Sequence, residues 1–118
     1  MTPTQLTLNL VEGSVSFSFS PTAARELQAA IAQLMDRLKT VAVKSNPVGK
    51  ATPQPPMEYR HAGEVFLEVF CNPNIWASPF AAKVLLTIKD SNIRLTSEAE
   101  LTRISEDIER YLEGVGDN

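Results

Sequence analysis

The sequence predicts an α+β fold: one antiparallel sheet of about five strands with two helices, in the order ββα, long loop, βββα. Three observations predict this arrangement. Apolar and polar side chains alternate through two separate hairpins, an amphipathic helix follows each hairpin, and a proline-rich stretch lies between the two units. A chain of 118 residues can bury a core of its own, so we expect one domain spanning residues 1–118.

The N-terminal unit is a hairpin followed by a helix. Leucines alternate with polar residues over Leu6–Leu10, and larger apolar side chains alternate with serines over Val15–Phe19. Glu12-Gly13 supplies the turn between them. Ser20-Pro21 then combines an N-cap hydroxyl with proline at the first helical position, and an apolar stripe continues the helix to about Lys39.

The middle of the chain breaks both patterns. Ser45–Gly63 is rich in proline and glycine and holds almost no aliphatic residues. We therefore predict a mobile loop over residues 45–63 with some polyproline II character. Loops of this length are uncommon in compact domains and are usually functional or disordered.

The C-terminal unit begins with a strand over Glu64–Cys71 whose apolar residues face both sides. A second hairpin follows, with strands over Lys83–Lys89 and Ile93–Thr96. Asp90-Ser91-Asn92 forms its turn, because these three residue types favour turns.

The last helix is predicted from a capping box, in which Ser97 caps the helix and Glu100 reaches back. Gly114 ends it as a C-terminal cap. Its apolar stripe consists of Leu101, Ile104, Ile108, Leu112 and Val115. We place its carboxylates on the opposite, solvent-facing side: Glu98, Glu106, Asp107, Glu109 and Glu113.

Composition indicates an ordinary globular protein of the cytoplasm. No stretch approaches the roughly 20 apolar residues that span a bilayer, and the N-terminus lacks the basic start and apolar core of a secretory signal. Cys71 is the only cysteine, which excludes an internal disulfide and fits a reducing compartment. We expect no association with membranes.

Charge is unevenly distributed, although the net charge is only −3. Residues 37–60 carry five cationic side chains and one carboxylate, whereas residues 97–118 carry two cationic side chains and seven carboxylates. The two regions could attract each other within one chain or between chains. The alternative is a solvated helix face beside an ordinary polar loop.

No catalytic constellation is present, so we predict that the protein is not an enzyme and needs no cofactor or metal. His61, the only histidine, falls in the predicted loop, where it reads as a solvated surface residue. Cys71 alternates with inward-facing residues and reads as a small buried hydrophobe. The sequence has neither a paired Cys/His set nor a glycine-rich phosphate loop.

The sheet face away from the helices offers two functional interpretations. Cations beside aromatic side chains on an open sheet can bind single-stranded nucleic acid through its phosphates and stacked bases. The cations placed there are Lys83, Lys89 and Arg94. The aromatic residues beside them are Phe66 and Phe70.

A second copy of the chain could instead cover this face, because an open apolar patch is unfavourable in a monomer. We place Phe66, Phe70 and Leu85 in that interface and favour this interpretation. Trp76, in an irregular apolar segment, either anchors the same interface or plugs one end of the core.

Two stretches resemble small uncharacterised cyanobacterial proteins: Val65-Phe-Leu-Glu-Val-Phe-Cys-Asn-Pro-Asn74 and Ile93-Arg-Leu-Thr-Ser-Glu-Ala-Glu-Leu101 with the helix after it. By fold, such proteins are similar to the single-stranded-DNA-binding transcriptional regulators of the positive-cofactor-four and Whirly kind. The resemblance covers about the C-terminal half of the chain. It implies a curved antiparallel sheet followed by a helix, and a dimer.

Together these observations predict a non-enzymatic, cytoplasmic, homodimeric interaction module. The alternative is a regulator that binds single-stranded nucleic acid on the outer face of the sheet, with the basic segment Lys44–Arg60 closing over the bound strand.

Overall fold

The computed structural model describes residues 5–44 and 53–115 and confirms the α+β class. In chain order its elements are β1 (Gln5–Asn9), β2 (Ser14–Ser18), α1 (Pro21–Lys44), β3 (Met57–Ala62), β4 (Phe66–Cys71), the short 3₁₀ helix η1 (Pro73–Ile75), β5 (Lys83–Lys89), β6 (Arg94–Glu100) and α2 (Leu101–Val115).

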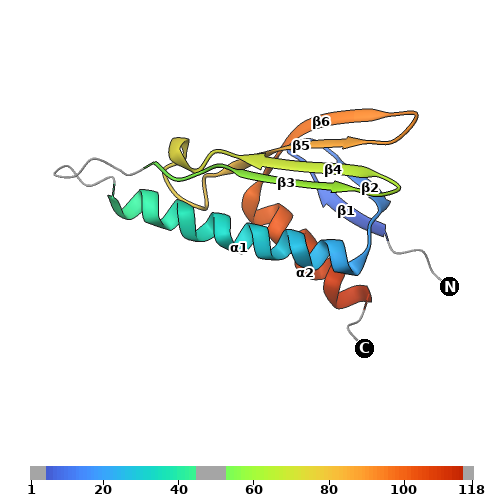
Figure 1. Cartoon of the computed structure of the whole chain (residues 1–118), viewed down its shortest axis with the longest axis horizontal. Helices are drawn as coiled ribbons and strands as arrows, with labels where there is room; N and C mark the ends of the chain where they lie inside the picture. Colours follow the sequence, from blue (N-terminus) through green and yellow to red (C-terminus); the bar gives the residue numbers. More distant parts are fainter. Residues whose placement is uncertain (1–4, 45–52, 116–118) are drawn as a thin grey trace.

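The strands form two antiparallel sheets, where the sequence predicted one. β1 and β2 pair with each other, and β3, β4, β5 and β6 follow one another as a four-stranded meander. The described residues therefore hold six strands, one more than expected. Both helices lie on the same side of the meander, with α1 running along β3 (Figure 1).

The additional strand, β3, corrects the prediction of a loop over residues 45–63. Met57–Ala62 pair residue by residue with β4, from Met57 opposite Cys71 to Ala62 opposite Phe66. The signal was present as an alternation in which Met57 and Tyr59 turn toward the core, but the prolines just before it masked it. Pairing with a neighbouring strand can outweigh the weak strand propensity of a segment, and here pairing with β4 makes Met57–Ala62 a strand.

The rest of the predicted loop divides into two parts. Residues 53–56 are irregular, and the Arg37 guanidinium on α1 donates to the carbonyl oxygens of Pro55 and Pro56 at 3.3 and 3.4 Å. Ser45–Thr52 lie outside the described residues.

The first hairpin and the start of α1 form as predicted. Gly13, with φ +97°, adopts the left-handed conformation that glycine tolerates, and its carbonyl accepts from the Leu10 amide at 2.9 Å. The Ser20 hydroxyl oxygen accepts from the Ala23 amide at 3.1 Å, which is the expected N-cap. The helix then runs to Lys44, beyond the predicted end at Lys39, because buried Val41 extends its apolar stripe.

The predicted capping box of the second helix is wrong. Ser97 and Glu100 belong to β6, where they pair with Leu86 and Lys83, and α2 begins at Leu101. The Leu101 amide donates to the Ala82 carbonyl at 3.0 Å, so the chain just before β5 takes up a donor that a cap would otherwise satisfy. Sheet pairing has overridden a local helix signal.

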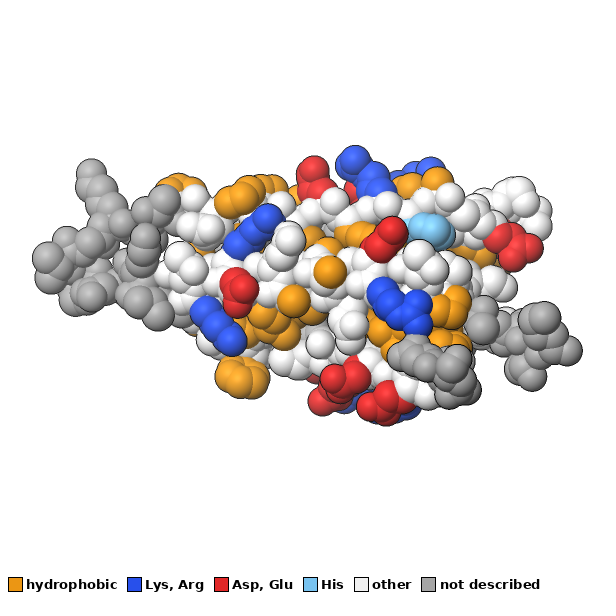
Figure 2. Space-filling model, turned by 60° about the horizontal axis from the view of Figure 1, so that its bottom comes forward, with side chains coloured by type: hydrophobic (Ala, Val, Ile, Leu, Met, Phe, Trp, Pro, Cys, Tyr) orange, Lys and Arg blue, Asp and Glu red, His pale blue; other side chains and the backbone are white. Residues whose placement is uncertain are grey.

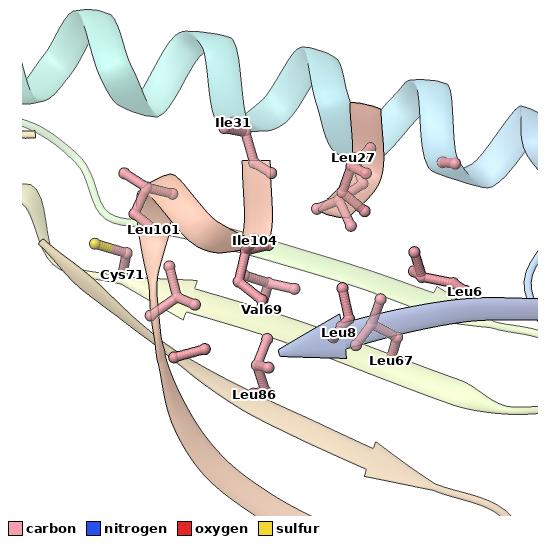
Figure 3. Close-up of a cluster of buried hydrophobic side chains, with 14 of the residues drawn as sticks. Leu6, Leu8, Leu27, Ile31, Leu67, Val69, Cys71, Leu86, Leu101 and Ile104 are labelled. Carbon is pink, nitrogen blue, oxygen red and sulfur yellow. The ribbon is translucent and has the colours of Figure 1, made fainter. Parts of the chain in front are cut away.

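One core joins both sheets and both helices. Leu6 and Leu8 from β1 lie among side chains from α1, α2 and the inner face of the meander (Figure 3). The largest fully buried side chains are Leu6, Leu8, Leu27, Leu34, Leu38, Leu67, Leu86, Leu101, Ile104, Ile108, Val69 and Val84. The β1–β2 hairpin therefore packs between the helices and the meander and does not extend the larger sheet.

A buried carboxylate on α2 holds the β1–β2 hairpin in place. Asp107 on α2, predicted to face solvent, is only 3% exposed. Its Oδ2 accepts from the Asn9 backbone amide at 2.7 Å, and its Oδ1 accepts from Asn9 Nδ2 at 2.8 Å. Arg110 adds a longer contact to Oδ1 at 3.4 Å. These bonds compensate for taking the charge out of water and join the end of β1 to α2.

No helix in the described residues is both long and apolar enough to cross a membrane.

Candidate interaction surface

The meander leaves one face open, opposite the helices. Leu67, Val69 and Leu86 point inward, so their neighbours along each strand point outward. We call this surface the outer sheet face; it consists of Glu58, Arg60, Ala62, Phe66, Glu68, Phe70, Lys83, Leu85, Thr87, Lys89, Arg94, Thr96, Glu98 and Glu100. The structure thus places on one face the phenylalanines, Leu85 and the cations that the sequence assigned to it.

The central strands give this face an apolar middle. Phe70 on β4 lies directly opposite Leu85 on β5, and Leu85 is 42% exposed. Phe66 and Phe70 are half-buried. Among the described elements no helix or strand covers these side chains (Figure 1).

Strand register arranges the flanking charges in rows across the sheet. The cationic row consists of Ala62, Phe66, Lys89 and Arg94. The neutral row consists of Arg60, Glu68, Thr87 and Thr96. The acidic row consists of Glu58, Phe70, Leu85 and Glu98. Charge therefore changes sign along the strand direction.

Two contacts hold side chains in place within these rows. Arg60 Nε donates to Glu68 Oε2 at 2.9 Å in the neutral row. In the cationic row, Lys89 Nζ lies 5.0 Å from the centre of the Phe66 ring, a cation–π distance. Both contacts restrain side chains that a partner would otherwise have to order.

The predicted nucleic-acid contacts do not form one cluster. Lys89 and Arg94 are paired at one end of the face, whereas Lys83 lies opposite Glu100 at the other. Six residues along a strand separate Lys83 from Lys89 by roughly 20 Å. Across the whole outer sheet face, the described residues supply four cationic side chains and four carboxylates.

Trp76 is not brought to the outer sheet face. It follows η1, which contacts α1, and its ring packs against the core. Its indole Nε1 is buried without a hydrogen-bond partner among the described residues. The neighbouring Ile75 and Phe80 are 67% and 85% exposed. Of these three apolar side chains, only Trp76 packs against the end of the core.

His61 lies on β3 and not in a loop, contrary to prediction. Its ring meets Phe19 edge to face, with centroids 5.2 Å apart. A cavity of about 340 Å³ beside it is lined in part by Ser18, Ser20 and Glu64. The contact to Phe19 gives this histidine a packing role.

On the inner side of the meander Cys71 is buried and Tyr59 is partly buried. Burial raises the pKa of the Cys71 thiol to about 11. Burial, with a smaller effect of the Glu26 carboxylate, also raises the pKa of Tyr59 to about 12, and the Tyr59 hydroxyl donates to the Ala23 carbonyl at 3.1 Å. Both groups stay neutral at ordinary pH, as packing residues do.

We expect the Cys71 thiol to be inert in the folded protein. A pKa of about 11 leaves on the order of one thiol in a thousand ionised at pH 8, and the residue is 2% exposed. Ellman's reagent should therefore label native protein only as fast as the fold opens, and denatured protein at once. Rapid, stoichiometric labelling without unfolding would show a reachable, reactive cysteine.

The side of the molecule turned forward in Figure 2 is mixed in character, with charged side chains of both signs among apolar ones. Among the described residues no group of three or more His, Cys, Asp or Glu side chains could hold a metal ion. Comparison with protein-family models, with curated proteins and with solved structures finds no match to this chain.

Proposed function

We propose that the protein is an interaction module whose outer sheet face packs against the same face of a second copy. One observation carries the proposal: Phe66, Phe70 and Leu85 leave apolar side chains on the uncovered side of the meander, on its two central strands, with Glu68 between the two phenylalanines. Burying these side chains against another copy removes them from water, which is the main favourable term in association.

The layout of the face supports this function. Specific interfaces have an apolar core and a polar rim. Here the phenylalanines and Leu85 lie on the central strands β4 and β5, while the edge strands β3 and β6 carry most of the charges: Glu58, Arg60, Arg94, Glu98 and Glu100. Equal numbers of both signs suit a surface that meets its own copy.

Single-stranded nucleic acid is the second candidate for the same face. The contact of Lys89 with Phe66, beside Arg94, favours it, because stacking and phosphate binding would both be available there. The four carboxylates on the face oppose it, since phosphate binding depends on a surplus of cations. We therefore rank it second.

Substituting Phe70 with aspartate should convert a dimer into a monomer. Two carboxylates would then enter the apolar centre of each dimer, where a charge is costly to desolvate. Sedimentation equilibrium at micromolar concentration should give a dimeric mass for the wild type and a monomeric mass for Phe70→Asp, with unchanged far-UV circular dichroism.

Phe80→Asp is the matched control. Phe80 is 85% exposed and lies outside the outer sheet face, so the same substitution there should leave the dimer intact. A monomeric wild type, or a dimer that survives Phe70→Asp, contradicts the proposal. An anisotropy titration with a labelled oligonucleotide at low salt then decides the second candidate: salt-sensitive binding that Phe66→Ala removes would establish it.

A further inference from the structure

The alternation of charge along the outer sheet face limits how two copies can meet. Packing a face against its own copy requires a twofold axis lying in the interface. Aligned sheets keep their strands within about 30° of each other, so this axis runs either along the strands or across them. The two choices bring different rows into contact.

An axis along the strands would place each row over the same row of the partner. The order of the strands would reverse, so that β6 faces the partner's β3. Glu98 would then meet the partner's Glu58, and this contact of like charges would occur twice. In the cationic row Lys89 would lie over the partner's Phe66 and Arg94 over the partner's Ala62, so the repeated contact of Glu98 with Glu58 is what disfavours this arrangement.

An axis across the strands, passing over Thr87 and Thr96, reverses the strand direction and keeps the strand order. The cationic row then lies over the partner's acidic row, and the neutral row lies over itself. Arg94 meets the partner's Glu98, and Phe66 meets the partner's Phe70, each contact occurring twice. In the cationic and acidic rows each charge therefore meets an opposite charge or an apolar neighbour. Arg60 and Glu68, which lie on the axis, each face their own copy and keep their ion pair within one chain.

We infer that two copies associate face to face in this antiparallel arrangement, with Arg94 of each chain paired with the partner's Glu98. The inference rests on the proposed function and adds its geometry. Sheets packed face to face lie about 10 Å apart, a gap that an arginine and a glutamate reaching from opposite sides can close. Both side chains are exposed in the single chain and are available for the contact.

Reversal of these two charges tests the arrangement. Arg94→Glu alone places four carboxylates in two contacts, and Glu98→Arg alone places four cations there. Each variant should raise the dimer dissociation constant roughly tenfold, since two exposed ion pairs become repulsive. An equimolar mixture of the two variants should regain wild-type affinity as a heterodimer, and the double variant should regain it as a homodimer.

The opposite arrangement gives a different result. If the axis ran along the strands, Glu98→Arg would meet the partner's Glu58 and would strengthen association, and mixing the variants would restore nothing. Either outcome overturns the inference. Arg103→Glu and Glu106→Arg, on exposed positions of α2, make the same charge changes away from the face and should leave the dissociation constant unchanged.

Sedimentation velocity over a concentration series measures every variant, and circular dichroism checks that each is folded. A dimer that Phe70→Asp abolishes but that the mixture does not rescue would keep the proposed function and reject this geometry. A monomeric wild type would reject both.

Discussion

Leu86→Ala is expected to lower the free energy of unfolding by about 2–5 kcal/mol, the cost of a cavity in a close-packed core. Leu86 is fully buried, lies opposite Val69 on β4, and points to the layer where β1 and the helices meet (Figure 3). Urea denaturation followed by circular dichroism should show a lower midpoint and an unchanged slope, which means that stability alone has changed.

Leu85→Ala provides a control one residue away. Leu85 points to the outer sheet face and is 42% exposed, so the folded chain should lose less than about 1 kcal/mol. Any larger loss of stability should depend on protein concentration, because it would act through association. The loss of stability from Leu86→Ala should be independent of protein concentration. Equal effects of the two substitutions would contradict the assignment of inner and outer faces.

Asp107→Ala is expected to lower the free energy of unfolding by about 2–4 kcal/mol. It removes the charged acceptor of two short hydrogen bonds and leaves the two donors of Asn9 without a partner. Asp107→Asn keeps the shape of the side chain, but its amide nitrogen, a donor, would face one of the two donors of Asn9. The stability of this variant should therefore lie between that of Asp107→Ala and that of the wild type. Thermal unfolding of the series gives the order directly.

The neighbouring Glu109 is the comparison that makes this prediction specific. Glu109 is exposed on the same helix, and its replacement by alanine should change stability by no more than about 0.5 kcal/mol. If Asp107→Ala were as mild as Glu109→Ala, the bond between β1 and α2 would contribute nothing to the fold.

Strict alternation made the outer sheet face predictable from sequence. Side chains two apart on a strand share a face, so Leu85 and Lys89 could be placed together before any strand order was known. The pairing of β4 with β5 and of β5 with β6 then confirmed which neighbours they meet. The rows of alternating charge could not be predicted, because they depend on the register between neighbouring strands, which the sequence of one strand does not specify.

The errors came from long-range contacts that replaced local signals. Met57–Ala62 follows four residues that include three prolines, yet β4 recruits it as a strand. Ser97 and Glu100 fit a helix cap, yet β5 holds them in a sheet. Asp107 had a detectable signal, because it lies three residues after Ile104 and four before Tyr111, both buried. A carboxylate on that stripe needs a partner, and Asn9 supplies it.

The bond between Asn9 and Asp107 joins residues 98 positions apart in the chain. At translation rates of about 5–20 residues per second, α2 leaves the ribosome on the order of 5 to 20 s after β1. A two-stranded hairpin is marginal by itself, and during that interval Leu6, Leu8 and Phe17 lack the part of their cover that α2 provides. The nascent chain therefore exposes part of its core beside β1 until α2 is made, which is the interval in which a chaperone could protect it.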